Sequence, residues 1–366
     1  MSPETLAATR PLIALAAIGA VLVALPTAAS AQSGDWVLPR LADGTPNLQG
    51  NWSNATMTPI QRPPGLELIL TPEQVAALEE GRQDFIEESR QDSDADREAP
   101  PVGGAPTGNA RFDAGGGGVG QPYNYFFVDA GDAVAFYDGQ PRSSLVVEPV
   151  DGRRPPLAEE GRRRAEARRA FNAQFGSYDN PENRPLAERC IMSFGSNGGP
   201  PMLPNYWYNN NYTIVQTPDH VMIMTEQVHD VRIIRMGEPK ALPTHMRPWM
   251  GDSWGRWEGD TLVIETTNIH PNQRMLSISL GGEFYPSEEI VVTERLTRVS
   301  ETKIHYEFLI EDPIVLSAPV RGEVPFNRLD GLVYEYACHE GNYSMENVLR
   351  GARSQEANER NENERR

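Results

Sequence analysis

The stretch 250–268 constrains the fold more than any other part of the chain. Trp257 ends an apolar run, and the Glu-Gly-Asp sequence at 258–260 has the chemistry of a tight turn. The residues that follow, Thr261–Thr267, are largely β-branched and alternate in polarity, which is typical of a half-buried strand. The stretch therefore predicts a β-hairpin. Similar runs lie on both sides of it, so we expect the hairpin to lie in the middle of a sheet.

From Cys190 onward the sequence is a nearly continuous series of such strands, separated by turn clusters such as Thr217–Asp219. Strands and helices do not alternate, which argues against a doubly wound fold. We expect a mainly β fold: an antiparallel meander that forms a closed or strongly curled barrel, lipocalin-like in outline, with an irregular N-terminal arm and two helices. The expected strands are 212–216, 221–226, 231–236, 254–257, 261–269, 289–299, 303–311, 320–327 and 332–337.

The first 31 residues have the pattern of an export signal. An apolar run, Pro11–Pro26, precedes the small-residue site Ala29–Ala31, so residues 1–31 predict a secretory signal peptide. A membrane anchor is the alternative, although the run is shorter than the ~20 residues that a span needs. No later run is long enough to span a bilayer, so we expect a periplasmic or secreted protein without stable membrane insertion after signal cleavage.

The remaining chain divides by composition. Trp52 is the expected anchor of the irregular arm in the core. The first helix should begin at Thr71, with Gln74 as its partner in a capping box. The predicted regions are 32–120 (irregular arm, acidic helix and Gly/Pro-rich linker), 121–189 (short strands and charged helix), 190–350 (β-barrel domain) and 351–366 (disordered tail).

The chain is strongly acidic, with a formal net charge of −18. Such a surface disfavours nucleic acid and anionic lipid as partners. Small molecules, cations, glycans and other proteins remain, and a small-molecule ligand is the partner that we expect.

The sequence contains two cysteines, Cys190 and Cys338. In an oxidising compartment an isolated pair favours a disulfide, and closing a loop of this length contributes about 5 kcal/mol on the chain-entropy description. The bond would tie the start of the β region to its last strand. A nucleophilic thiol or a metal ligand is the competing interpretation, but neither cysteine has a CxxC spacing or a convincing partner.

Several motifs in combination resemble those of a large, uncharacterised family of exported bacterial β-rich proteins. The likeness covers approximately residues 126–353, and it implies a shared fold and export but no particular activity. The motifs are Asn209–Asn211, Gln216–Asp219, Glu226–Asp230, Trp249–Asp252, Gly255–Val263 (GRWEGDTLV) and Tyr334–Tyr343 (YEYACHEGNY).

Charged residues on two apolar strands mark the first candidate site. Strand alternation places Met222, Met224 and Glu226 on one face, and Arg232 continues an apolar stripe on the next strand. A charge in such a stripe is usually paired or lines a cavity. Glu226 and Arg232 either form a structural ion pair near a barrel rim or flank a ligand pocket. In the second case His229 would donate or accept a proton, and the methionines would form an adaptable apolar wall.

His270 closes a similar stripe on the hairpin's second strand, so it and His229 could face the same barrel opening as catalytic residues beside Glu226. A lone histidine at such a place is more often an ordinary surface residue. The six histidines show no spacing typical of metal ligands, and we predict no metal site. A site assembled from distant strands, such as His229, His270 and Glu226, is the alternative.

Aromatic residues are concentrated near the same strands. The run Tyr206–Tyr208, together with Trp249, Trp254 and Trp257, could stack on a sugar or an aromatic ligand. Packing of the core and rim explains the same residues without a ligand.

Three functions fit these observations, and none of them identifies a cofactor. The first is an exported barrel that binds a small apolar or aromatic molecule in its lumen. The second is a cofactor-independent lyase, isomerase or hydrolase that uses a histidine–carboxylate pair. The third is an envelope scaffold without a pocket. Binding ranks first, because no residue has the spacing of a known catalytic device.

Overall fold

A computed structural model describes residues 36–89, 129, 131–193, 198–205, 208–240, 242–276 and 284–365. The chain divides into two compact units, residues 1–36 and 37–366, and the helices and strands below all belong to the second. The predicted export signal and the predicted acidic and Gly/Pro-rich linker, 91–120, lie outside the described residues. Within the described part, none of the helices combines the length and apolar character that crossing a membrane requires.

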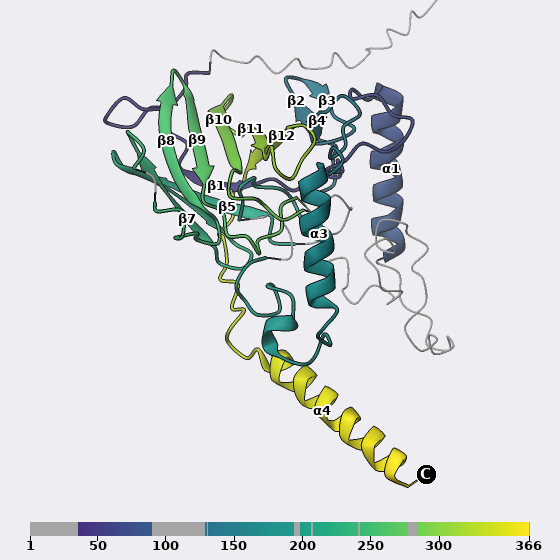
Figure 1. The fold of residues 1–366 in the computed structure, drawn as a ribbon. Helices are drawn as coiled ribbons and strands as arrows, with labels where there is room; N and C mark the ends of the chain where they lie inside the picture. The colour runs from purple at the N-terminus through teal and green to yellow at the C-terminus, as the bar shows by residue number, and fades with distance from the viewer. Residues whose placement is uncertain are drawn as a thin grey trace, which may run out of the picture. The chain divides into compact units, whose positions relative to one another are not determined.

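Nine of the described strands form a closed barrel, which confirms the predicted meander (Figure 1). Neighbouring strands follow chain order around the ring, and β1 closes it by pairing with both β5 and β12. All of these pairs are antiparallel except β7 and β8, which run parallel. The barrel strands are β1 (Gly50–Ser53), β5 (Asn211–Gln216), β6 (His220–Thr225), β7 (Val231–Met236), β8 (Asp252–Glu258), β9 (Thr261–Thr267), β10 (Val291–Arg298), β11 (Lys303–Glu311) and β12 (Val320–Arg328).

The predicted hairpin is the pair β8–β9. Glu258 is paired with Thr261, which leaves Gly259 and Asp260 as a two-residue turn. Gly259 has a φ of 60°, and a type II′ turn requires glycine at this first turn position because side chains strain that conformation.

The closing strand β1 is the main feature that the sequence did not predict. Its four residues were expected to belong to an irregular arm, yet Trp52 is paired with Tyr212 on β5 and with Arg328 on β12. The predicted anchoring of Trp52 is confirmed, because its side chain is fully buried. A strand of four residues that includes glycine and asparagine is too short to show an alternating pattern.

The predicted strand 332–337 is wrong: this segment forms no regular strand. Leu332 and Tyr334 are exposed. The barrel is already closed by β1, and β4 (Val146–Glu148) pairs with β12 as well, so β12 has no edge left for another partner. Two further short strands, β2 (Phe136–Tyr137) and β3 (Gln140–Pro141), form a separate hairpin.

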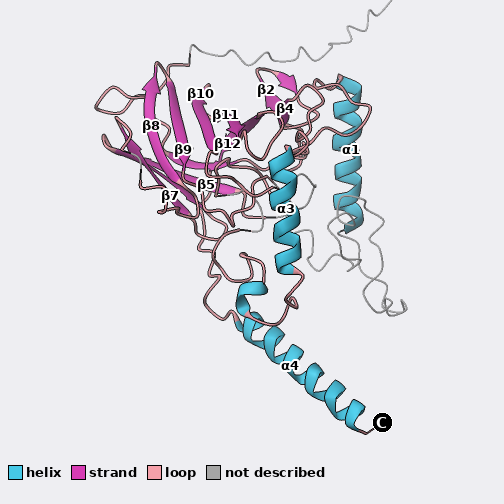
Figure 2. Cartoon of the chain, in the orientation of Figure 1, coloured by secondary structure: helices cyan, strands magenta, loops and turns pink. Residues whose placement is uncertain are grey.

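Figure 2 shows the helices in cyan. Helix α1 (Pro72–Ser89) begins with the predicted capping box: Thr71 N–H donates to Gln74 Oε1 at 2.8 Å, and Gln74 N–H donates to Thr71 Oγ1 at 3.3 Å. Helix α3 (Glu159–Asn172) is the predicted charged helix, and the short helix η2 spans Pro181–Asn183. Helix α4 (Tyr343–Glu364) includes most of the tail that was expected to be disordered, and it has no buried residue.

Side chains fill the middle of the barrel. Tyr212, Tyr306 and Phe326 form a buried aromatic cluster, with ring centroids 5.0 Å apart for Tyr212–Phe326 and 5.4 Å apart for Tyr306–Phe326. Aliphatic side chains such as Ile264 and Leu296 complete the packing. These residues have almost no surface that water can reach, whereas the lining of a ligand-sized cavity would have such surface. Space for a ligand must therefore be sought at the ends of the barrel.

Candidate functional site

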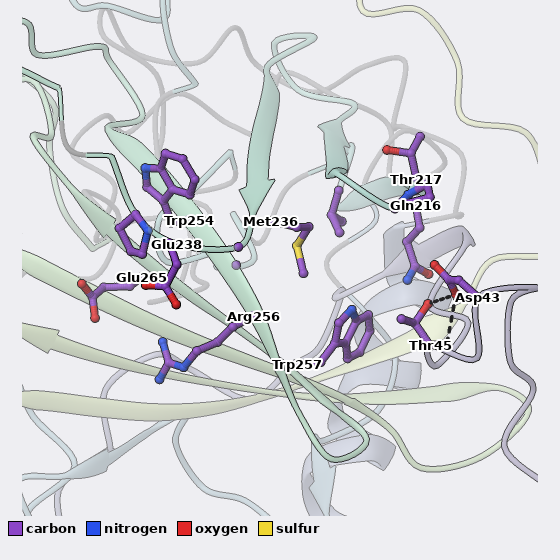
Figure 3. A pocket seen from close by; sticks show the side chains of 15 residues that line it. Asp43, Thr45, Gln216, Thr217, Met236, Glu238, Trp254, Arg256, Trp257 and Glu265 are labelled. Atoms are coloured by element: carbon purple, nitrogen blue, oxygen red, sulfur yellow. Dashed lines mark hydrogen bonds between the residues drawn. The ribbon is translucent and has the colours of Figure 1, made fainter.

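A pocket of about 370 Å³ opens at one mouth of the barrel (Figure 3). It lies where the turn between β5 and β6, the end of β7, and β8 with β9 meet residues 43–45 of the N-terminal arm. Figure 3 shows two groups of side chains on either side of Met236: Trp257 and Gln216 with Asp43 in one, and Trp254 with Glu265 in the other. The volume suits a small organic ligand.

The part of the pocket beside Trp257, its inner half, is apolar at its base. Strand alternation turns Val221 and Trp257 toward the interior, and both Met236 and Trp257 pack against the core. Gly255 has no side chain, and Met236 lies over it: a Cβ at this position would be 2.7 Å from Met236 Sδ. Glycine at 255 therefore makes room for the thioether that forms the pocket wall.

The N-terminal arm closes the inner half. Gln216, at the end of β5, donates from Nε2 to Pro46 O at 3.0 Å and accepts a hydrogen bond from Leu48 N–H at 2.6 Å. Asp43 accepts hydrogen bonds from the Thr45 hydroxyl at 2.6 Å and from Thr45 N–H at 3.0 Å. The hydroxyl bond lowers the pKa of the Asp43 carboxyl, so Asp43 is ionised at neutral pH.

The part of the pocket beside Trp254, its outer half, exists because β7 and β8 run parallel. Only two residue pairs join them, Arg235–Trp254 and Met236–Gly255, and a parallel pair needs a crossover connection. The crossover leaves at Gly237, whose N–H donates to Gly255 O at 3.1 Å. It is held by Asp252, which accepts from Leu242 N–H at 3.0 Å and forms an ion pair with Arg235.

Charged side chains surround Trp254 on this outer face. The Arg235 guanidinium lies 4.2 Å from the centroid of the Trp254 ring, and the buried Trp254 Nε1 has no acceptor among the described residues. Arg256 forms an ion pair with Glu258 at 2.8 Å. Glu265 is paired with Trp254 across the strands and is exposed.

Glu226 lies elsewhere, with its carboxylate buried and hydrogen-bonded. Its Oε2 accepts from Asn211 Nδ2 at 2.7 Å, and its Oε1 accepts from Tyr334 N–H at 3.1 Å. Glu226 therefore joins β5 to the segment that follows the barrel. The structural ion pair that was considered between Glu226 and Arg232 is not formed, because Arg232 is paired with Glu294.

Arg232 belongs to a polar network inside the barrel. Its Nη1 lies 2.8 Å from Glu294 Oε2, and its Nη2 donates to Glu294 Oε1 at 3.0 Å. The Tyr306 hydroxyl also donates to Glu294 Oε1, at 2.7 Å, and accepts from Met202 N–H at 2.8 Å. Burial raises the pKa of the Tyr306 hydroxyl, and the nearby charge of Glu294 raises it further. This network positions core strands and is not open to a ligand.

His229 is exposed and has a left-handed backbone, with a φ of 74°. Its Nδ1 lies 3.3 Å from Tyr336 O, and its ring centroid lies 5.7 Å from that of His339. The perturbed group is its neighbour Asp230: burial raises the pKa of that carboxyl to about 6, against smaller lowering effects of His229 and of the Ser193 backbone N–H. Asp230 Oδ2 is buried without a hydrogen bond among the described residues.

The sequence did not single out Asp230. Its burial comes from a distant loop: a Cβ at Gly198 would lie 3.1 Å from Asp230 Oδ2. Packing of this kind leaves no local signal in an aspartate that follows a polar turn.

His270 and Trp249 lie together, with ring centroids 3.9 Å apart. His270 Nδ1 accepts from Asn272 N–H at 3.1 Å. Burial, with the nearby charges of Arg247 and Arg168, lowers the pKa of His270. The structure thus gives His229 and His270 different partners.

The remaining candidates are scattered. Met222 and Met224 are half-buried on the outer face of β6, opposite the buried Val221 and Ile223. Of the aromatic residues that could stack on a ligand, Trp254 and Trp257 line the pocket and Trp249 does not. Tyr206 lies outside the described residues. The described residues include no group of three or more histidine, cysteine or acidic side chains that could hold a metal ion.

The predicted disulfide between Cys190 and Cys338 is confirmed, and it joins residues 148 positions apart. Cys338 follows the barrel in a loop, so the expectation that it lies on the last strand is wrong. A disulfide is typical of an oxidising compartment.

Comparison of the chain with protein families, curated proteins and solved structures gave no match in any of the three.

Proposed function

We propose that this protein is an exported binding protein that holds a small apolar or aromatic molecule at the mouth of its barrel. The observation that carries the proposal is the pocket of about 370 Å³ with Met236 and Trp257 as its apolar wall. The packed barrel interior directs the ligand to the mouth instead of the centre of the lumen. Export is supported by the disulfide and by the signal-like first 31 residues.

The proposal is tested with N-phenyl-1-naphthylamine, a neutral aromatic probe whose fluorescence rises in apolar surroundings. We expect saturable binding, and we expect Trp257→Ala to weaken it at least tenfold, because the variant removes one wall of the pocket. Trp249→Ala is the matched control, since Trp249 is also half-buried but packs against His270, outside the pocket. Absence of saturable binding, or equal losses in the two variants, would contradict the proposal. The first of these results would favour the envelope scaffold.

A second candidate function is acid–base catalysis beside His229. The observation that favours it is the Asp230 carboxyl next to His229: its Oδ2 is buried without a hydrogen bond among the described residues, and burial raises its pKa to about 6. A group that titrates near neutrality can both accept and donate a proton. The carboxylate of this hypothesis is Asp230 in place of Glu226, whose oxygens are engaged in hydrogen bonds. Hydrolysis of p-nitrophenyl acetate that is lost in Asp230→Asn, and retained in Trp257→Ala, would support it. Equal rates in wild type and Asp230→Asn would show that Asp230 takes no part in the reaction and would contradict this candidate.

A further inference from the structure

We infer that the mouth pocket selects an organic cation, a small molecule with an aromatic or apolar body and a protonated amine. The inference rests on the proposed function and specifies its ligand. Among the described residues that line the pocket, Asp43, Glu238 and Glu265 carry carboxylates, whereas Arg256 is the one cationic side chain.

The charge that a ligand encounters in the pocket depends on which of these side chains are already in ion pairs. The Arg256 guanidinium is engaged with Glu258, at 2.8 Å from Nη2 and 3.0 Å from Nε. Glu258 also pairs with Arg295 at 2.9 Å. In contrast, Glu238 and Glu265 have no ion pair or side-chain hydrogen bond with any described residue, and both are exposed. An entering ligand therefore meets two uncompensated carboxylates and a neutralised arginine.

The aromatic walls point to the same ligand class. Indole faces attract cations through the ring quadrupole, and the structure already uses this interaction where the Arg235 guanidinium lies over Trp254. No cation of the described residues lies over the ring of Trp257. An ammonium group near the carboxylates would leave the ligand's apolar body to contact Trp257 and Met236, which form the apolar wall.

The whole-chain charge acts in the same direction. A formal net charge of −18 draws cations toward an acidic opening and repels anions. This long-range effect is not specific to the pocket, and the experiment must separate it from the local carboxylates.

Three ligands of nearly equal shape serve as probes: 2-phenylethylamine, 2-phenylethanol and 3-phenylpropanoate. Their affinities are measured by calorimetry at pH 7 in low salt. We expect the amine to bind at least tenfold more tightly than the alcohol, and the carboxylate to bind more weakly than both. Raising the salt concentration should weaken only the amine, because salt screens charges.

Paired substitutions locate the effect. In Glu238→Gln/Glu265→Gln, the affinity for the amine should fall to that for the alcohol, while the affinity for the alcohol stays within twofold of wild type. The control Glu335→Gln/Glu340→Gln changes the net charge equally at exposed positions that do not line the pocket, and it should keep the preference for the amine.

Each other result overturns the inference. Equal affinities for the three probes would remove charge selection and leave the proposed function intact. Equal losses in the two paired variants would assign the preference to the net charge. Binding of none of the three probes, together with none of the naphthylamine, would contradict both the inference and the proposed function.

Discussion

Arg232 on β7 and Glu294 on β10 form an ion pair inside the barrel, with Nη1 2.8 Å from Oε2. Both side chains are almost completely removed from water. Two strands that are not neighbours in the sheet are thereby joined across the interior. Removing a charge from water is costly, so either side chain alone would destabilise the barrel interior, whereas the pair compensates both charges.

Glu294→Ala should lower the free energy of unfolding by about 3–5 kcal/mol, because it leaves the buried Arg232 guanidinium without a counter-charge. Urea unfolding measures this loss. The matched control is Glu258→Ala, which removes an exposed carboxylate that also pairs with arginines and should cost less than about 1 kcal/mol. Arg232→Met/Glu294→Leu should recover most of the loss. Equal costs for the two alanine variants would refute the structural role given to this pair.

Removal of the Cys190–Cys338 disulfide should destabilise the protein substantially. The bond joins residues 148 positions apart, and chain entropy alone gives about 5 kcal/mol for a loop of that length. We expect Cys190→Ala/Cys338→Ala to lose about 2–5 kcal/mol in urea unfolding, and reduced wild type to lose a similar amount. The variant should be insensitive to reductant. An oxidised wild type no more stable than the reduced protein would show that the bond does not stabilise this fold.

Asp230 should make stability depend on pH. Its pKa is raised from 3.8 to about 6 in the folded protein, so the fold binds this proton more tightly than the unfolded chain does. The contribution to stability is therefore present below pH 4 and is lost as the pH rises through 6. The shift corresponds to at most about 3 kcal/mol, and partial exposure reduces it.

Asp230→Asn removes this titration while keeping an oxygen that can accept the Ser193 hydrogen bond. The difference in stability between the variant and wild type should therefore change with pH. We expect it to move in the variant's favour by on the order of 2 kcal/mol when the pH is raised from 4 to 7.5. Urea unfolding of both proteins at the two pH values gives the difference directly. A difference that does not change with pH would mean that Asp230 titrates normally.

The barrel could be predicted from the sequence because most of its strands show an alternating pattern. The pattern correctly gave β7, β11 and the β8–β9 hairpin. It missed β1, whose pairing with both β5 and β12 depends on contacts between distant parts of the chain. Alternation of Leu332, Tyr334 and Tyr336 gave a false strand, because the pattern does not show that the barrel is already closed.

The pocket was harder to predict than the barrel. Trp254 was named as a ligand-binding residue, but Glu238 and Glu265 were not. They come together because β7 and β8 run parallel and the crossover returns past β8. The available signal was the long connection 237–251, which exceeds a hairpin turn and is long enough for a crossover. The charged residues that were named, Glu226 and Arg232, are instead engaged in structural hydrogen bonds and an ion pair.

The most direct test of the central claim is a ¹⁵N–¹H spectrum of the tryptophan indoles during titration with N-phenyl-1-naphthylamine. Trp254 and Trp257 line the pocket, whereas Trp52 is buried in the core and Trp249 packs against His270. We predict saturable shifts of the Trp254 and Trp257 signals, with Trp52 and Trp249 unchanged. Saturable binding that leaves the signals of Trp254 and Trp257 in place would contradict the assignment of the ligand to the barrel mouth.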